Sequence, residues 1–242
     1  MTESRYHRQI QVEGIGPEGQ RRIGGARVAV VGVGALGCAV ADQLVRAGVR
    51  SIRLIDSDTP ELSNLTRQVL IDEDDVERKR PKALAAAQKL KRANSEVLVE
   101  PRVARFDPET ARDLIDGIDL VFDGTDNFET RYLINRVCLE RRLPWVFGGV
   151  LGMSGMSFPV VPGGPCLCCA LGPGPADGRV ETTLERGVLL ATVSAVASWE
   201  VVRGLKIMMG KPVRPNLIVV DLDRESVRCV KIERDPGCPI CG

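Results

Sequence analysis

Residues 27–37 read RVAVVGVGALG, a short apolar run followed by a glycine-rich turn. The run has the composition of a buried strand, and the spacing from Ala35 to Ala47 is helical and ends at Gly48. The turn between them has the pattern G-x-G-x-x-G, formed by Gly32, Gly34 and Gly37. The first two glycines permit a tight turn and a close approach of the backbone to phosphates, and the third lets helix and strand pack together. The pattern predicts a nucleotide-binding turn, although it does not distinguish NAD from ATP and also occurs in ordinary tight turns.

Apolar runs and helical patterns alternate around this unit, as in βαβ folds. A helical lead-in is expected over 4–24, strands at 51–55, 97–103, 119–123 and 145–150, and helices at 81–92 and 127–142. Beyond residue 150 we expect an antiparallel strand pair at 152–161, a Gly- and Pro-rich loop at 162–183, a helix at 185–209 and a hairpin of 217–220 with 226–232. The expected class is α/β: a Rossmann-like, mostly parallel sheet continued by antiparallel strands.

The composition excludes several classes of function. The chain has 242 residues, 33 Lys and Arg against 32 Asp and Glu, and only 4% aromatic residues, so neither a polybasic nucleic-acid surface nor base-stacking platforms are expected. No apolar run reaches the roughly 18 residues of a membrane span, and no signal peptide is recognisable, which predicts a cytoplasmic protein without a membrane or nucleic-acid partner. A single histidine, His7, excludes His-rich metal sites and most His-based catalytic triads.

Polar residues follow the next two central strands. Asp56 lies about 20 residues after the glycines, where a carboxylate can bind ribose hydroxyls. The segment after it is unusually polar for a dehydrogenase, and its Asn64, Arg67 and Gln68, with Lys82 downstream, are candidates to face polyphosphate. The alternative is a solvated surface loop. Asp126 is a candidate Mg²⁺ ligand, although Asp126 or Asn127 would also serve as a helix cap.

Taken in order, these motifs resemble the MoeB/ThiF/HesA adenylyltransferases, relatives of the ubiquitin-activating enzymes. The residues that carry the resemblance are G-x-G-x-x-G, Asp56-Ser57-Asp58, Ser63-Asn64-Leu65-Thr66-Arg67-Gln68, Pro81-Lys82, Asp123-Gly124-Thr125-Asp126-Asn127 and the N-terminal Arg5-Tyr6-His7-Arg8-Gln9-Ile10. The similarity extends over essentially the whole chain.

The resemblance implies a reaction and a set of residues for it. Mg-ATP would adenylate the C-terminal carboxylate of a small ubiquitin-like sulfur carrier that ends in Gly-Gly, with release of pyrophosphate. It assigns catalysis to Arg8, Arg67, Lys82 and Asp126, with Asp126 as the Mg²⁺ ligand. Nucleotide binding is assigned to Gly32, Gly34, Gly37, Asp56, Asp58, Asn64, Arg67, Gln68, Lys82, Asp126 and Asn127. Arg8 matches an arginine that relatives insert into the neighbouring subunit, which implies a homodimer. Lys79 or Arg80 would share the role of Lys82, because the spacing here is slightly longer.

The eight cysteines include two C-x-x-C pairs, Cys166/Cys169 and Cys238/Cys241. Two such pairs suit a tetrahedral Cys₄ zinc knuckle of structural type. Redox pairs and unrelated thiols are the alternatives. The redox alternative is disfavoured, because neither pair is expected to open a helix after a thioredoxin-like strand. The family resemblance agrees with zinc. Cys168 would replace a ligand or, less readily, transfer sulfur, whereas core positions are expected for Cys38, Cys138 and Cys229.

Several relatives carry a further cysteine in the loop where this chain has Thr183. Threonine is a poor nucleophile without an activating base, so we expect adenylation without a covalent transfer step and sulfur from a separate donor protein. We expect a single adenylation domain over 1–242, with an arm at 1–25, a nucleotide-binding half at 26–150 and a carrier-binding and zinc half at 151–242. The alternatives are adenylation of a peptide or natural-product carboxylate, a non-catalytic binding subunit and an NAD oxidoreductase.

Overall fold

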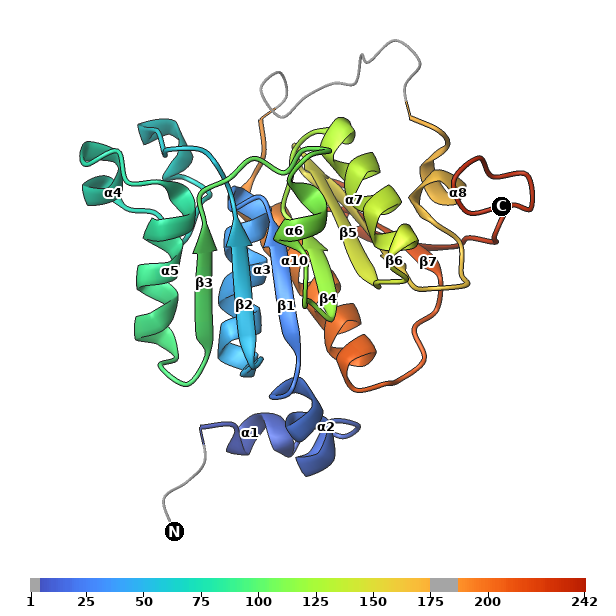
Figure 1. The fold of residues 1–242 in the computed structure, drawn as a ribbon, viewed down its shortest axis with the longest axis horizontal. Coiled ribbons are helices and arrows are strands. Elements are labelled where there is room, and N and C mark those ends of the chain that lie inside the picture. Colours follow the sequence, from blue (N-terminus) through green and yellow to red (C-terminus); the bar gives the residue numbers. More distant parts are fainter. Residues whose placement is uncertain (1–4, 175–186) are drawn as a thin grey trace.

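One eight-stranded sheet organises the computed structural model, which describes residues 5–174 and 187–242 (Figure 1). Its strand order is β3-β2-β1-β4-β5-β6-β7-β8. Five strands are parallel, and the three that follow β5 are antiparallel. The strands are β1 Arg27–Val31, β2 Ser51–Ile55, β3 Leu98–Arg102, β4 Leu120–Asp123, β5 Trp145–Leu151, β6 Ser154–Val160, β7 Asn216–Asp221 and β8 Ser226–Lys231. The α/β class and the mixed sheet expected from the sequence are confirmed.

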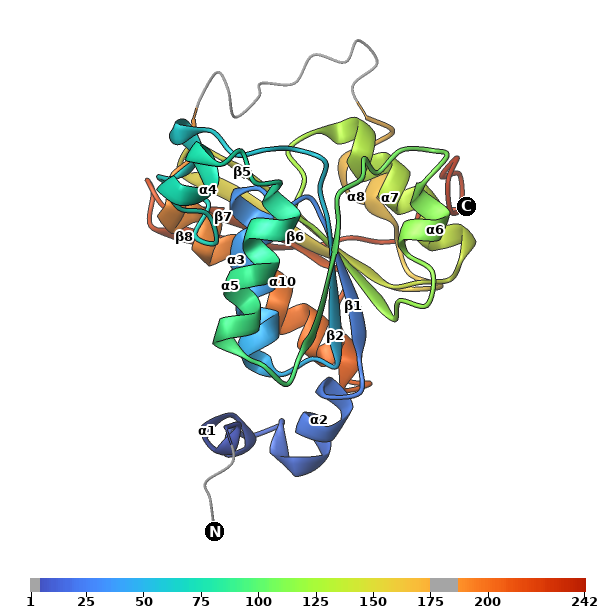
Figure 2. The ribbon, with the colours of Figure 1, turned by 60° about the vertical axis from the view of Figure 1, so that its left-hand side comes forward.

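Helices cover both faces of the sheet (Figure 2). One face carries α3 (Ala35–Ala47), α5 (Lys82–Ala93) and α10 (Leu190–Met208), and the other carries α6 (Ala111–Leu114), α7 (Phe128–Glu140) and α8 (Leu167–Leu171). Strand β1 shows the alternation that this arrangement requires. Val28 and Val30 join the core under α3 and α10, whereas Ala29 and Val31 join the core under α7. A strand buried on both faces reads as the continuous apolar run that the sequence contains.

The parallel part of the sheet has a topological switch point between β1 and β4. These strands are neighbours, but the chain continues from β1 to β2 on one side and from β4 to β5 on the other. The loops after β1 and β4 therefore lead to helices on opposite faces of the sheet, an arrangement that in open α/β sheets leaves a crevice at the carboxyl edge. This is where open α/β sheets bind ligands.

The N-terminal helices α1 (His7–Ile10) and α2 (Gly16–Ile23) lie at the opposite end of the sheet (Figure 1). The Asn94 side chain donates a 2.9 Å hydrogen bond to the Tyr6 hydroxyl, and Gln9 donates one of 2.9 Å to the Ala47 carbonyl. The Tyr6 ring also fills the space at Gly48, where a side chain would collide with it. These contacts fix the arm against the ends of α3 and α5 that point away from the carboxyl edge.

Four local expectations were wrong. The expected strand pair at 152–161 is instead a single strand, β6 (Ser154–Val160), which pairs with β5 and β7. Helix α10 begins at Leu190 rather than at residue 185, and the expected 162–183 loop contains α8. The short helix α4 (Glu73–Glu77), the 3-10 turn η1 (Leu62–Asn64) and α6 were not anticipated. Cys229 is exposed on the edge strand β8 instead of buried.

In the part of the chain that the structure describes, no helix is both long enough and apolar enough to cross a bilayer.

Candidate functional site

Three glycine backbones pack against one another at the switch point. Gly32 has a left-handed φ of 85°, and a Cβ there would collide with the Gly124 carbonyl that follows β4. A Cβ at Gly37 would collide with the Gly32 carbonyl, so helix and strand approach as closely as backbones allow. Gly34 differs, because the nearest atom to a Cβ there is the Gly124 oxygen at 3.8 Å. The protein does not need glycine at that position for its own packing.

Gly34 is also the cap residue of α3, and no side chain caps this helix. The first N–H groups of the helix therefore face the open space at Gly34 with the positive end of the helix dipole behind them. An anionic group is the natural occupant of such a cradle.

Asp56 connects the glycine turn to the segment after β2. Its carboxylate accepts the Val33 N–H at 2.7 Å and the Asp58 N–H at 2.8 Å. Burial raises the pKa of the Asp56 carboxyl, and these two backbone donors act in the opposite direction. Asp58 in turn forms a 3.1 Å ion pair with Lys82. The structure thus brings Asp56, Asp58 and Lys82 to the glycine turn through direct contacts.

The remaining polar residues of this segment lie at the same end of the sheet (Figure 1). Asn64 is buried and accepts the Glu61 N–H at 3.1 Å, and Arg67 is partly buried and donates to the Ser63 carbonyl at 2.8 Å. Gln68 is 4% exposed, and its Oε1 has no partner among the described residues. The hydrogen bonds of Asn64 and Arg67 run to Glu61 and Ser63 of the same segment. These bonds do not join the segment to the glycine turn.

Lys79 and Arg80, which were expected to share the role of Lys82, do not make its contact with Asp58. Arg80 pairs with Asp75, which is fully buried, and with Asp74 at 3.2 Å. Lys79 is exposed and adopts a left-handed φ of 48°. Only Lys82 is paired with Asp58 beside the glycine turn.

The loop after β4 is held by a buried ion pair. Asp123 is fully buried and accepts from the Thr125 N–H and hydroxyl at 2.9 and 2.6 Å, while Arg131 donates to it at 3.2 Å and to the Thr125 carbonyl at 2.7 Å. Burial raises the pKa of Asp123, and Arg131 opposes that rise. Asn127 caps α7 by accepting the Thr130 N–H at 2.9 Å. Asp126 is exposed and has no hydrogen bond or ion pair with the described residues, so its carboxylate is available to a cation.

Two charged residues near the site carried no sequence signal. Arg131 looked like one more polar residue of a surface helix, yet it organises the Asp123 loop. Glu200 of α10 is fully buried, and neither of its oxygens has a hydrogen-bond partner among the described residues. Burial raises the pKa of Glu200 well above its ordinary range, and the Asp123 charge adds to this effect. A Cβ at Gly148 would collide with this carboxyl, so Gly148 provides the room for it.

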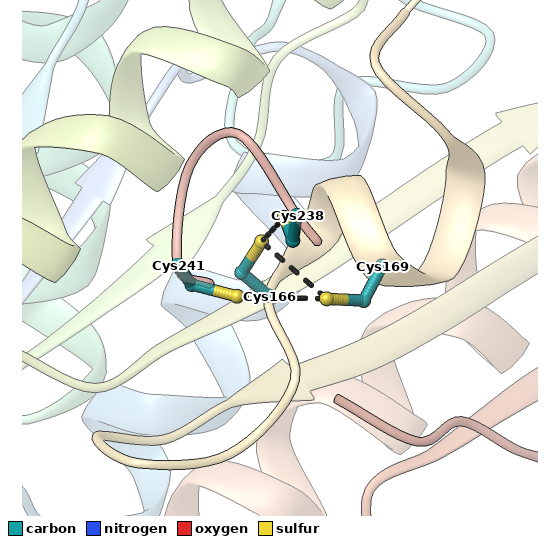
Figure 3. Close-up of side chains that lie close together, drawn as sticks. All are labelled: Cys166, Cys169, Cys238 and Cys241. Carbon is teal, nitrogen blue, oxygen red and sulfur yellow. Dashed lines mark hydrogen bonds between the residues drawn. The ribbon is translucent and has the colours of Figure 1, made fainter. Parts of the chain in front are cut away.

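Four cysteines form a separate centre beside α7 and α8. Their sulfur atoms point toward one another from the α8 end and from the C-terminal segment (Figure 3). The distances are 3.7 Å from Cys166 to Cys238, 3.5 Å from Cys169 to Cys241 and 4.0 Å from Cys166 to Cys169. Disulfide sulfurs would lie about 2.05 Å apart, whereas tetrahedral ligands with zinc–sulfur bonds of about 2.3 Å lie roughly 3.8 Å apart. The arrangement therefore fits a metal.

Cys166 is the cap residue of α8, so the first pair opens a short helix, but not one that directly follows a strand as in a thioredoxin-like motif. The helix has only five residues, and the second pair completes a four-sulfur cluster. Cys168 lies outside that cluster, and burial raises its pKa to about 11, which disfavours a reactive thiolate.

Arg8 lies on α1, remote from the crevice of its own chain (Figure 1). It is exposed and donates a 3.4 Å hydrogen bond to the Gln11 side chain.

Thr183 and the loop around it lie outside the described residues.

A family model described as the ThiF family matches residues 6–240. The chain belongs to the ThiF family. The sulfur carrier protein ThiS adenylyltransferase of Bacillus subtilis is 40% identical over 98% of this chain and 71% of that protein. The sulfur carrier protein adenylyltransferase of Thermus thermophilus is 39% identical over 98% and 90%, and the molybdopterin-synthase adenylyltransferase of Escherichia coli is 34% identical over 98% and 96%.

Solved structures support the fold of this ThiF-family chain. The crystal structure of Escherichia coli MccB with ATP superposes with a TM-score of 0.86 at 24% identity, over 99% of this chain and 74% of that one. MccB in complex with N-formylated MccA gives a TM-score of 0.88 at 24% identity, over 100% and 76%. At this identity the likeness shows the common fold alone.

Proposed function

We propose that this ThiF-family protein is an adenylyltransferase of sulfur carrier proteins. It activates the C-terminal carboxylate of a small ubiquitin-like carrier with ATP. The observation that carries the proposal is the open cradle at Gly34, which lies between the uncapped end of α3 and the loop that presents Asp126. The relatives at 34–40% identity, which are named adenylyltransferases of such carriers or of molybdopterin synthase, supply the reaction.

The chemistry needs positioning and charge neutralisation more than covalent participation by the protein. A carboxylate oxygen of the carrier attacks the α-phosphorus of ATP, the bond to the bridging oxygen breaks, and pyrophosphate leaves. The α3 N-terminus and Gly34 would hold the phosphates, Asp56 the ribose, and Lys82 and Arg67 the developing negative charge. Asp126 would hold Mg²⁺, which neutralises phosphate charge when it is bound.

Carrier-dependent ATP–pyrophosphate exchange tests this function. Labelled pyrophosphate should enter ATP only when a ubiquitin-like protein ending in Gly-Gly is present, and deletion of that Gly-Gly should abolish the exchange. Exchange with a short peptide but with no carrier would favour the peptide-adenylating alternative. No exchange with either substrate would leave the non-catalytic alternative.

Substitutions at Gly34 and Gly37 should have different effects. A side chain at Gly34 would enter the proposed phosphate site, whereas a side chain at Gly37 would collide with the protein backbone. Gly34→Ala should change the free energy of unfolding by less than about 0.5 kcal/mol, since its Cβ meets no protein atom closer than 3.8 Å. The same methyl group would occupy the phosphate cradle and should weaken ATP binding by about tenfold or more. Gly37→Ala should instead destabilise the fold by about 2–3 kcal/mol through its collision with the Gly32 carbonyl.

Urea unfolding and calorimetric titration with ATP would separate these two effects. Normal ATP affinity in the Gly34→Ala protein would contradict the assignment of the cradle, whatever the result at Gly37.

We also propose a homodimer whose sites are shared between subunits. Arg8 lies at the end of the sheet opposite the crevice, so it is poorly placed to reach the ATP of its own chain (Figure 1). A second copy would bring its own Arg8 to the crevice, as the family resemblance implies.

For the four-cysteine centre we propose structural zinc. The sulfur distances fit a tetrahedral site, and four protein thiolates leave no open position for substrate. When bound, zinc would link the C-terminal segment to α8.

The purified protein should contain about one zinc per chain, and Cys238→Ser/Cys241→Ser should contain none. That variant should also lose several kcal/mol of unfolding free energy, because metal binding is coupled to folding. Cys229→Ser is the control, since Cys229 is exposed and outside the cluster, and it should keep its zinc. Elemental analysis decides the matter: a metal-free wild-type protein, or zinc retained in the double variant, would exclude this assignment.

A further inference from the structure

Asn135 lies in the middle of α7 and faces the cysteine centre. Its side chain is fully buried, and its Oδ1 accepts a 3.1 Å hydrogen bond from the N–H of Leu167. Leu167 directly follows Cys166, one of the four clustered cysteines, and is the first residue of α8. Asn135 is therefore in contact with the backbone that presents a metal ligand.

The other half of the same amide has no partner. Asn135 Nδ2 is buried and makes no hydrogen bond among the described residues. The Leu167 N–H requires an acceptor, which fixes the oxygen on that side and leaves the NH₂ group on the other. A buried donor without an acceptor costs about 1–3 kcal/mol, so an amide retained here implies an acceptor that the protein alone does not provide.

The Cys166 sulfur is the candidate acceptor, because Cys166 directly precedes Leu167 in the chain. Asn135 holds the N–H of the residue that directly follows Cys166, helices α7 and α8 are in contact, and the side chains of Asn135 and Cys166 are both fully buried. A metal-bound thiolate accepts N–H donors far better than a neutral thiol does, because it carries negative charge.

We infer that Asn135 is a positioning residue of the metal centre: its Oδ1 holds the Leu167 N–H while its Nδ2 donates a hydrogen bond to the metal-bound Cys166 thiolate. The inference rests on the proposed zinc site. Four thiolates around Zn²⁺ carry a net charge of about −2, and outer donors of this kind disperse such charge. Asparagine suits the position because one planar group supplies both an acceptor and a donor.

The geometry also connects two parts of the molecule. Helix α7 begins after Asn127, beside the loop of Asp126, and reaches Asn135 about two turns later. Between these positions Tyr132 donates a 2.7 Å hydrogen bond to the Gly172 carbonyl, just beyond α8. The metal centre is thereby braced against the helix that opens at the candidate nucleotide site.

Two substitutions test the donor. Asn135→Asp keeps an acceptor for the Leu167 N–H but removes the NH₂ group and places a carboxylate beside thiolates. Asn135→Ala removes both halves of the amide without adding charge. In competition with a chromophoric chelator, the zinc dissociation constant should rise about 10- to 100-fold in the alanine variant and further in the aspartate variant.

Cobalt substitution provides a readout that a purely structural role would not move. The sulfur-to-cobalt charge-transfer band should shift to lower energy in Asn135→Ala, because a thiolate that loses an N–H donor gives up electron density more readily. Asn94→Asp is the matched control. Asn94 is equally buried, at 1% exposure, but its amide donates to Tyr6 and to the Val45 carbonyl, both at 2.9 Å, far from the cysteines. It should retain the wild-type zinc affinity and cobalt spectrum.

The outcomes separate this inference from the zinc site itself. A wild-type chain that binds no zinc would overturn the site, and the role of Asn135 with it. If the wild-type chain binds zinc and folded Asn135→Ala matches it in affinity and in cobalt spectrum, only the role of Asn135 is overturned. Should Asn135→Asp fail to fold, the alanine variant alone decides.

Discussion

Asp126→Ala is expected to reduce carrier-dependent ATP–pyrophosphate exchange by about 10²-fold or more, while the protein stays folded. Asp126 is exposed and has no hydrogen bond or ion pair among the described residues, so its removal breaks no contact there. The free energy of unfolding should therefore change by less than about 0.5 kcal/mol. The loop itself is fixed by Asp123 and Arg131, which the substitution leaves in place. The loss would thus fall on Mg²⁺ positioning rather than on structure.

Glu129→Ala is the matched control for this variant. Glu129 is an exposed carboxylate in the first turn of α7, only three residues along the chain. If general negative charge at this helix end supported the reaction, both variants would be impaired. We expect wild-type exchange from Glu129→Ala, and wild-type exchange from Asp126→Ala would refute the Mg²⁺ assignment.

The turn at Gly32–Gly37 was predictable because its determinants are local. The strand before it is buried on both faces, close backbone packing requires glycine at positions 32 and 37, and α3 ends at a left-handed Gly48. Each of these features leaves its own mark on the sequence.

Strand β6 was mispredicted because its course is decided by distant residues. The strand pair expected over 152–161 would need a reversal within it, but Gly155 lies inside β6, where a Cβ would collide with Val196 of α10. Glycine marks a close approach in this strand instead of a reversal. Cys229 illustrates the same limitation: its place in a strand suggested a core position, and only the sheet order reveals that β8 is an edge.

The residues of the candidate site also differ in whether local sequence or tertiary packing determines their position. Asp56 and Asp126 follow the ends of β2 and β4, where parallel-sheet geometry makes their convergence predictable, whereas Lys82 begins α5 and was singled out by the family resemblance. Asn135 contacts Leu167, which is distant in the sequence, and Arg131 reaches Asp123 only because the loop between β4 and α7 folds back on it, so no spacing rule identifies either residue. The family resemblance therefore supplied the candidate nucleotide-binding residues, while the residues that support them required the structure.

A mixed dimer of Arg8→Ala with Asp126→Ala is expected to recover activity that neither variant has alone. Each homodimer should be inactive, because every site lacks one essential group. In the mixed dimer, one site combines Asp126 of the Arg8→Ala chain with Arg8 of the other chain and is complete. The second site lacks both groups. The mixed dimer should therefore show about half the wild-type exchange rate per dimer.

Two affinity tags on co-expressed chains allow the mixed species to be purified over both resins before the exchange assay. The reason to expect recovery is the position of α1, which contacts the ends of α3 and α5 farthest from the crevice. If Arg8 instead served its own chain, each chain of the mixed dimer would contain one defective site, and no activity would return. A double variant carrying Arg8→Ala and Asp126→Ala in one chain, paired with a wild-type chain, distinguishes the models again. Sharing between subunits then leaves no complete site, whereas independent sites leave the wild-type chain fully active.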